Sequence, residues 1–313
     1  MDPVDFKRGA LMVLGIDFGK AETCAAVSVG KEIFPVHSSS RPFSILNGAE
    51  LWTKKEEALR YFRETAERCF GYSISQVRIA CPVFSEENER LAMLQAAEDA
   101  GMAGTLIEEP IAATACFDHI YGFKAGEKVA VCDFGRGEFC AAIVEKQPDK
   151  SWRILSCRKN EESSGTEFQK SLRDELVKRL SFKNDLSAAL EKPHFLAFLE
   201  QESERVMWRL SAMNETVFQV PFGYGDILEC SISRTDFNML VGSKIWKTVR
   251  MLENMAQEIG SALKQMDGVI CVGGRAQIPY VQEIVERAAG KHTLRLPDPK
   301  MAICRGLIVD TLE

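Results

Sequence analysis

Two twelve-residue stretches of this chain are identical at seven of their twelve positions. "DFGKAETCAAVS" begins at Asp17 and "DFGRGEFCAAIV" begins at Asp133, and in each an apolar run ends at the aspartate. The glycine two positions later favours a tight turn into a second strand, where backbone N–H groups can approach an anion closely. The aspartate can hold a hydrated Mg²⁺ ion, which binds few carboxylates and keeps several waters. The repeat therefore predicts two turns that grip a phosphate chain.

Two known phosphate-site motifs compete with this interpretation. The Asp-Phe-Gly triplet is typical of protein kinases, but the chain has no His-Arg-Asp motif and no GxGxxG loop. "GIDFGKA" is one residue too short between its glycines for a phosphate-binding Walker loop, and Ala21 stands where a hydroxyl would bind Mg²⁺. A duplicated hairpin without a ligand is the remaining alternative, and either copy alone would favour it.

The bulk composition excludes several classes of protein. The 313 residues permit two modest domains or one two-lobed domain, and the net charge of −6 gives no basic footprint for nucleic acid or an anionic membrane. No apolar run is long enough to span a bilayer. The ten cysteines show no CxxC spacing and the four histidines no metal-ligand spacing, so we expect a reducing cytoplasmic environment and no histidine-bound metal.

Each half of the chain begins with the repeated strand–turn–strand pattern. In the first half, helical spacing runs over 53–70 with Thr53 as a plausible N-cap, and a second helix begins at Ser85. In the second half we expect a helix from Thr166, a long helix ending near Ser211 and a closing helix over 299–312. No low-complexity linker separates the halves, which favours two packed α/β lobes.

Seven segments resemble a known family when taken in order. They are "GIDFG", "IACPVFSEENERLAMLQAAEDAGM", "IEEPIAATACF", "VAVCDFGRGEFCAAIVE", "ESERVMWRLS", "VICVGGRAQIPYVQEIV" and "DPKMAICRGLIV". Together they resemble the nucleotide-binding domain of the heat-shock 70-kDa chaperone family over nearly the whole chain. The resemblance implies an α/β, two-lobed actin-like ATPase fold, in which each lobe is a ribonuclease-H-like mixed sheet with flanking helices. It also implies ATP or ADP with Mg²⁺ between lobe I (1–125 plus 298–313) and lobe II (126–297).

The resemblance assigns roles by matched position. Asp17 and Asp133 match the acids beside the Mg²⁺–phosphate site, reached through water, and Glu109 matches the glutamate near the attacking water; Glu109 and Asp133 would be the catalytic residues. The other matched positions are phosphate-loop and nucleoside-loop glycines and two nucleoside contacts: Gly19, Gly135, Gly137, Gly165, Gly273, Gly274, Glu204 and Ser211. Each residue also has a structural alternative, because glycines turn chains and the acids can simply pair with Lys20 or Arg136.

The departures from the family pattern fall at the same loops. Small hydroxyl residues of the first loop are replaced by Lys20 and Ala21, and the second loop has Arg136 and Glu138 where the family has glycine and threonine. Further departures are Cys140 for an aspartate, Arg275 for the adenosine-loop serine, Gln277 for an arginine, and Met207 and Trp208 for a lysine and the adenine-stacking arginine. Trp208 can stack on adenine in its place, or pack in the core at helical spacing.

Two family parts have no counterpart in the sequence. The long insertion that carries a catalytic lysine is reduced to little more than one helix within 37–76, and no convincing replacement for that lysine is present. The chain ends at Glu313, just after the last family helix, so no peptide-binding domain is expected. Because removing one positioned transition-state donor costs about 10²–10³ in rate, several such losses predict weak or absent hydrolysis.

Lys20 and Arg136 leave two outcomes open for the cleft. They can bind the anionic tail of ATP, or form salt bridges with Asp17, Asp133, Glu22 and Glu138 that close it. We expect a divergent ATP-binding protein that serves as a regulatory or scaffolding subunit of a chaperone system, with a co-chaperone, J-domain or ribosome-associated partner by analogy. The alternatives are an active Mg²⁺-dependent ATPase that uses Lys20, and a polymerising actin-like protein.

Overall fold

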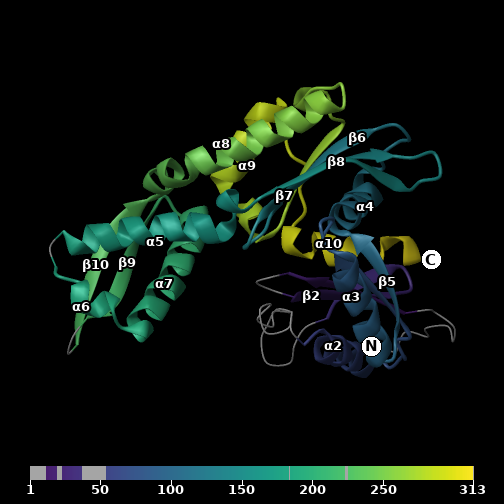
Figure 1. The fold of residues 1–313 in the computed structure, drawn as a ribbon, viewed down its shortest axis with the longest axis horizontal. Helices are drawn as coiled ribbons and strands as arrows, with labels where there is room; N and C mark the ends of the chain where they lie inside the picture. The colour runs from purple at the N-terminus through teal and green to yellow at the C-terminus, as the bar shows by residue number, and fades with distance from the viewer. Residues whose placement is uncertain (1–11, 20–22, 37–53, 183, 223–224, 313) are drawn as a thin grey trace, which may run out of the picture.

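The computed structural model describes residues 12–19, 23–36, 54–182, 184–222 and 225–312 (Figure 1). The first lobe contains a five-stranded sheet in the order β3-β2-β1-β4-β5. Its strands are β1 (Val13–Phe18), β2 (Thr23–Val29), β3 (Glu32–Pro35), β4 (Gln76–Cys81) and β5 (Ala103–Glu108). The first three strands form an antiparallel meander, while β4 lies parallel to β1 and β5 parallel to β4.

The second lobe repeats this arrangement. Its four-stranded sheet has the order β11-β6-β7-β8, an antiparallel meander with β11 parallel to β6. Its strands are β6 (Lys128–Phe134), β7 (Phe139–Lys146), β8 (Trp152–Asn160) and β11 (Gly268–Val272). The two hairpins also share their register, because Asp17 lies opposite Cys24 just as Asp133 lies opposite Cys140. In the place of a fifth strand, Leu294 makes a single parallel bridge to Ile270.

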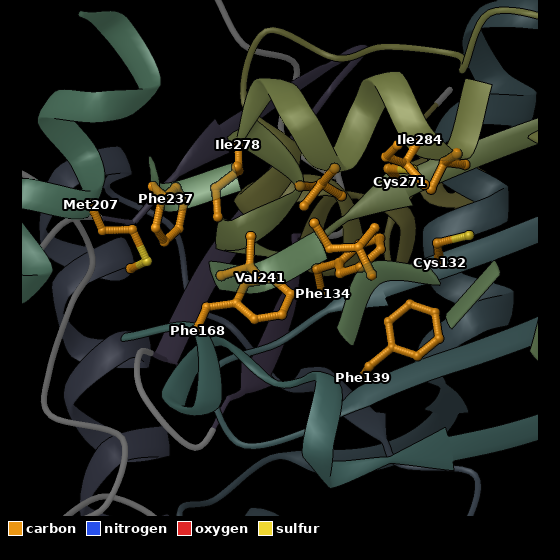
Figure 2. Packing of buried hydrophobic residues seen from close by; sticks show 14 of the residues in the cluster. Cys132, Phe134, Phe139, Phe168, Met207, Phe237, Val241, Cys271, Ile278 and Ile284 are labelled. Atoms are coloured by element: carbon orange, nitrogen blue, oxygen red, sulfur yellow. The ribbon is translucent and has the colours of Figure 1, made fainter. Parts of the chain in front are cut away.

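The alternation of side chains along these strands builds three apolar layers. In the first lobe, one face of the sheet packs on α2 (Lys55–Phe70) and α3 (Glu87–Asp99). The opposite faces of both sheets enclose α4 (Glu109–Tyr121) and the short α10 (Ala302–Gly306), which thus lie between the lobes. The outer face of the second sheet, with Phe134 and Phe139, packs on the remaining helices (Figure 2).

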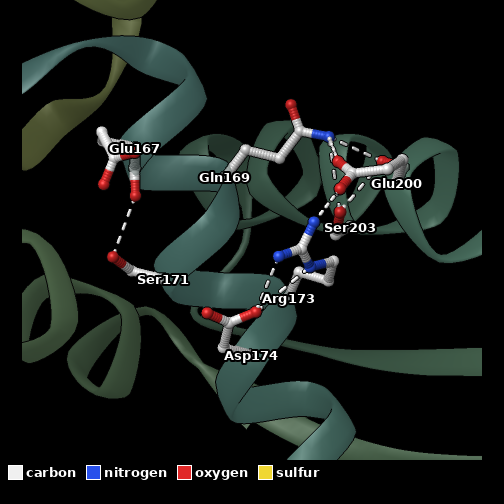
Figure 3. Close-up of polar contacts among 7 residues, drawn as sticks. All are labelled: Glu167, Gln169, Ser171, Arg173, Asp174, Glu200 and Ser203. Atoms are coloured by element: carbon white, nitrogen blue, oxygen red, sulfur yellow. Dashed lines mark hydrogen bonds and ion pairs between the residues drawn. The ribbon is translucent and has the colours of Figure 1, made fainter. Parts of the chain in front are cut away.

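The second lobe extends into a helical region with its own hairpin. Figure 1 shows this region at one end of the molecule. Its elements are α5 (Gly165–Ser181), α6 (Ser187–Leu190), α7 (Pro193–Ala212), β9 (Glu215–Phe222) and β10 (Asp226–Ser233), followed by α8 (Arg234–Glu258) and α9 (Pro279–Ala289). Gln169 of α5 donates to the backbone carbonyl of Glu200 at 2.7 Å, and Arg173 pairs with the Glu200 carboxylate (Figure 3). These contacts fix α7 against α5.

Three expected helix boundaries are corrected. The helix predicted from Ser85 begins at Glu87, because the Glu86 and Glu89 side chains form a capping box while Ser85 closes a turn onto Pro82. The helix predicted from Thr166 begins at Gly165, with Ser164 as its N-cap. The closing helix is only α10 between two short 3₁₀ turns. Thr53 lies outside the described residues.

The short closing helix α10 packs very closely against two neighbouring elements. A Cβ atom on Gly306 would lie 1.7 Å from the carbonyl oxygen of Ala112 in α4, and one on Gly15 of β1 would lie 2.5 Å from the carbonyl oxygen of Cys304. The backbone of α10 thus touches both neighbours directly. Among the described helices, none combines the length and apolar character needed to cross a membrane.

Candidate functional site

A cleft of about 360 Å³ is lined by residues from both lobes. The loop after β4 contributes Phe84, and the β6–β7 turn contributes Gly135, Arg136, Gly137 and Glu138. Further lining residues come from elements far apart in the sequence: Asp17, Gly19, Glu109, Asp133, Cys140, Lys159, Glu204, Gly273, Gly274, Arg275 and Lys300. The duplicated hairpins therefore contribute to one cavity, as their sequence repeat predicted.

Three carboxylates lie together in this cleft. Asp17 near the end of β1, Asp133 near the end of β6 and Glu109 at the start of α4 all line it. Burial, followed by repulsion from Asp133, raises the pKa of Asp17 to about 7, and burial with repulsion from Glu138 raises the pKa of Asp133 to about 7. Burial and then repulsion from both aspartates raise the pKa of Glu109 well above its usual value. The group therefore retains protons near neutral pH, and a bound cation would release them.

The β6–β7 turn is held in place by the start of α5. The backbone N–H of Gly165 donates to the carbonyl of Gly135 at 3.0 Å, and that of Thr166 donates to the carbonyl of Arg136 at 2.8 Å. The Ser164 hydroxyl accepts from the backbone N–H of Glu167 at 3.3 Å. These three donors at the beginning of α5 are thus used within the protein, and they support the turn rather than face a ligand.

Arg136 does not pair with the acids that the sequence suggested. Its guanidinium lies 3.9 Å from the carboxylate of Glu204 on α7, and Glu138 pairs with Lys159 at 3.5 Å. Of the two outcomes left open by the sequence, the one in which Arg136 forms a salt bridge with Asp17, Asp133 or Glu138 is therefore not found among the described residues. The reason is that the exposed Arg136 extends from the turn toward α7 rather than toward the acids. Lys20 and Glu22 lie outside the described residues.

Three charged residues of the cleft lining, Glu204, Arg275 and Lys300, form a cluster with Trp208, which lies behind them. The Arg275 side chain is only 6% exposed, and its guanidinium donates to Glu204 at 3.0 Å. The guanidinium carbon lies 5.2 Å from the centroid of the Trp208 ring, and the Lys300 amine lies 5.4 Å from that ring. We call Glu204, Trp208, Arg275 and Lys300 the Arg275 cluster. It contains two of the residues that depart from the family pattern, Trp208 and Arg275.

Gly273 brings this side of the cleft close to the acids. It has a φ of +83°, and a Cβ atom there would lie 2.4 Å from Asp133 Oδ1 and 2.7 Å from the carbonyl oxygen of Phe134. Only glycine adopts this positive φ readily and has no Cβ atom to clash with Asp133 and Phe134. The loop after β11 therefore packs directly on Asp133 and restricts where its carboxylate can lie.

The sequence also matches a family model once this geometry is established. A model described as Hsp70 protein matches residues 55–311. The chain belongs to the Hsp70 family. Its two mixed sheets with flanking helices form the two-lobed actin-like ATPase fold, and Hsp70 proteins are chaperone-type ATPases that bind nucleotide with magnesium. The match begins after the first hairpin, so the assignments of Asp17 and Gly19 rest on the repeat and on their place in the cleft.

The acidic residues of this Hsp70 protein fit a hydrated metal ion. Among the described residues, no group of three His, Cys, Asp or Glu side chains is arranged to hold a metal directly. By the family resemblance, Asp17 and Asp133 would reach Mg²⁺ through water, which suits its preference for hard oxygen ligands and retained waters. When bound, Mg²⁺ neutralises phosphate charge. The chain's own part is to place the two carboxylates in one cleft.

Most of the residues predicted from the sequence line the cleft, and three do not. Gly165 is buried behind Arg275, where an added Cβ would lie 2.6 Å from Arg275 Nε. Trp208 is half-buried beside Arg275 and Lys300, outside the cleft lining. The Ser211 hydroxyl donates to the carbonyl of Met207 at 3.2 Å. The nucleotide roles of all these residues remain predictions.

Sequence reasoning missed several residues that line the cleft. Lys159 of β8 lies opposite Cys140 in the sheet register, and its amine lies 5.6 Å from the Phe84 ring centroid. Aligning the second meander strand by strand would have found Lys159. Lys300 precedes α10, and nothing in its local pattern distinguishes it from a surface lysine.

Proposed function

We propose that this Hsp70-family protein binds adenine nucleotide weakly and hydrolyses it slowly or not at all. The observation that carries the proposal is the buried Arg275 guanidinium, paired with Glu204 and lying over Trp208. In the family resemblance these positions belong to the nucleoside end of the cleft. A nucleoside entering there has to displace Arg275 from a charge-assisted hydrogen bond, which contributes about 1.5–3 kcal/mol.

The charge of the cleft supports weak binding. The described lining residues include seven carboxylates and four cationic side chains. Glu138 adds a carboxylate beside Asp133, which further raises the pKa of that residue. As Asp17 and Asp133 lose their protons above about pH 7, a nucleotide without a divalent cation meets net repulsion, so we expect binding there to depend strongly on Mg²⁺.

The parts that position the reacting groups are also altered. Phosphoryl transfer depends mainly on positioning and charge stabilisation. Ala21 and Lys20 replace hydroxyl residues of the first loop, and Glu138 replaces a threonine of the second. Ala21 and Glu138 lack the hydroxyl donor of the family residues, and Lys20 puts a long cationic side chain in place of a small hydroxyl, which supports slow or absent hydrolysis.

The cellular role follows by analogy with atypical members of the family. A protein that keeps the two lobes but hydrolyses poorly would serve as a regulatory or scaffolding subunit of a chaperone system in the cytoplasm. Its partner would be a co-chaperone, such as a J-domain protein or a ribosome-associated complex. Co-purification from cells, followed by mass spectrometry, tests the partner: recovery of a J-domain protein or ribosomal proteins in stoichiometric amounts is the expected result.

Calorimetric titration with ATP and ADP, with and without Mg²⁺, tests the nucleotide proposal. We expect Mg²⁺-dependent binding in the high micromolar range or weaker. Tight binding that does not require Mg²⁺ would contradict it.

One observation favours a second function, an active ATPase: Asp17, Glu109 and Asp133 line the same cleft. Single-turnover hydrolysis separates the two functions by comparing the wild type with Asp133→Ala and Lys20→Ala. Turnover that both substitutions abolish would establish the active enzyme. Light scattering with increasing protein concentration and nucleotide tests the polymerising alternative in the same preparation.

A further inference from the structure

Two cysteine side chains touch each other beside the cleft. The sulfur atoms of Cys140 on β7 and Cys157 on β8 lie 3.8 Å apart. In the sheet register Cys140 lies opposite Lys159 and Cys157 opposite Ala142, so the two cysteines are diagonal neighbours on one face of the sheet. Both are partly exposed, and Cys140 also lines the cleft. A small molecule in the cleft can therefore reach this pair.

We propose that Cys140 and Cys157 form an oxidation site at which a hydroperoxide, such as hydrogen peroxide, converts the two thiols into a reversible disulfide. The thiolate of one cysteine attacks a peroxide oxygen and the O–O bond breaks; the products are a sulfenic acid and, after protonation, water from hydrogen peroxide or an alcohol from an organic hydroperoxide. The second thiol then attacks the sulfenic sulfur, the S–O bond breaks, and water leaves. Two electrons and two protons pass from the thiols to the peroxide.

The other described cysteines lack either a cysteine neighbour or exposure to solvent. Cys132 on β6 and Cys271 on β11 also lie opposite each other, but both are buried in the core of the second lobe (Figure 2). Cys69 is exposed and Cys230 half-buried, and within the described chain neither contacts another cysteine sulfur. Only Cys140 and Cys157 combine, among the described residues, mutual contact with partial exposure.

The disulfide would change the cleft because the sheet has to adjust. Diagonal neighbours in an antiparallel sheet have Cα atoms about 7–8 Å apart, whereas disulfides usually join Cα atoms about 4.4–6.8 Å apart. The ladder is already interrupted nearby, because Ile143 pairs with Ser156 and Val144 with Ile154, which leaves Leu155 of β8 as an extra residue close to Cys157. Because Cys140 pairs with Asp133 across the β6–β7 ladder, a shift of Cys140 also displaces Asp133. A strained bond of this kind is readily reduced, which suits a transient signal in a reducing compartment.

The experiment treats the fully reduced full-length protein with hydrogen peroxide and alkylates the remaining thiols. Peptide mass spectrometry without reduction then identifies the cross-linked cysteines. We expect a Cys140–Cys157 linked peptide as the main product and its complete loss on adding dithiothreitol. Cys140→Ser and Cys157→Ser should each abolish it, while Cys230→Ser should leave its rate of formation unchanged.

A second readout follows the consequence for the cleft. Hydrogen–deuterium exchange over residues 133–140 should rise on peroxide treatment of the wild type and not of Cys157→Ser. Separate sulfenic acids without a cross-link would overturn the proposal. A Cys132–Cys271 linkage of equal yield would also overturn it, because oxidation would then follow unfolding. Neither result depends on nucleotide binding, so the outcome is independent of the proposed function.

Discussion

The guanidinium carbon of Arg275 lies 5.2 Å from the centroid of the Trp208 ring, and the same guanidinium donates to Glu204. Trp208 and Glu204 lie one turn apart on α7, while Arg275 follows the double glycine after β11. The contact thus joins the helical region of the second lobe to its sheet. The Glu204 carboxylate is thus already hydrogen-bonded to a side chain of the protein. A nucleoside that binds there has to break this hydrogen bond, which weakens its binding.

Replacing Arg275 by serine should improve nucleotide binding. The change removes the charge-assisted hydrogen bond that a nucleoside has to break, and it frees the Glu204 carboxylate. We expect the affinity for Mg²⁺–ADP to rise about tenfold, since a tenfold change corresponds to about 1.4 kcal/mol. Isothermal titration calorimetry measures the change directly.

Arg287 offers a matched control for this substitution. It is exposed on α9 and does not line the cleft, so Arg287→Ser removes the same charge without opening the site. Its affinity should equal that of the wild type. If Arg275→Ser instead weakens binding, Arg275 contacts the nucleotide and the proposed obstruction is wrong.

Asp17 and Asp133 should make the protein less stable as the pH rises from about 4 to about 7. Each has a pKa of about 7 when folded and a usual value of 3.8. Between these values the folded state holds protons that the unfolded state releases, so rising pH favours unfolding, and the effect levels off above about 7. Asp17→Asn and Asp133→Asn should therefore raise the melting temperature near neutral pH, and this advantage should shrink toward pH 4.

Glu286 provides a control of opposite sign. Burial by itself would raise the pKa of Glu286, but hydrogen bonds from Arg295, His292 and Thr293 outweigh it and lower the pKa to about 2. Its stabilisation is present above its usual pKa of 4.5 and is lost as the pH falls toward 2. Glu286→Gln should thus lower the melting temperature at neutral pH and have little effect near pH 2. Parallel pH profiles for both sets of variants would show that these assignments are wrong.

The repeat predicted a large part of the fold because it carries both the strands and their register. Two copies of Asp-Phe-Gly with the same spacing to cysteine already implied that Asp17 and Asp133 occupy equivalent places in two sheets. The side-chain partners were not predictable in this way. Arg136 pairs with Glu204 only because α7 packs on α5 and brings its carboxylate to the turn, a tertiary contact with no local signal.

Tertiary contacts without a local sequence signal also limited the prediction of the closing helix. The spacing over 299–312 favours one continuous helix, whereas the structure has only α10 between 3₁₀ turns. At the end of α10 the backbone of Gly306 contacts α4 directly, and such a contact depends on how two distant segments meet.

Lys146 should stabilise the contact between α4 and the second sheet. Its side chain is 10% exposed and pairs with Asp118 of α4, and its amine lies 5.1 Å from the Trp152 ring centroid. Lys146→Met leaves the Asp118 carboxylate without its cation, so we expect a loss of about 2–3 kcal/mol in the free energy of unfolding. Urea denaturation of Lys146→Met, Asp118→Asn and the double variant measures the coupling between the two side chains.

Glu145 on β7, next to Lys146, and Arg153 on β8 form a comparison pair. Their separation is 2.7 Å, but the Arg153 side chain is 62% exposed, so Arg153→Met should cost less than about 1 kcal/mol. A coupling energy for Lys146 and Asp118 no larger than that of this exposed pair would contradict the prediction.

Gly306 should tolerate no side chain, because α10 and α4 meet there backbone to backbone. A Cβ atom would lie 1.7 Å from the Ala112 carbonyl oxygen, so Gly306→Ala has to push the helices apart between the two lobes. Overpacking costs about 1–3 kcal/mol, and we expect the upper end because the opposing atom is backbone.

Gly242 is a control for this substitution. It lies within α8, where an added Cβ would find its nearest neighbour, the Tyr280 hydroxyl, at 3.4 Å. Gly242→Ala should therefore be neutral or stabilising by up to about 1 kcal/mol. Urea unfolding compares the two variants, and equal effects would show that α10 has room to move away from α4.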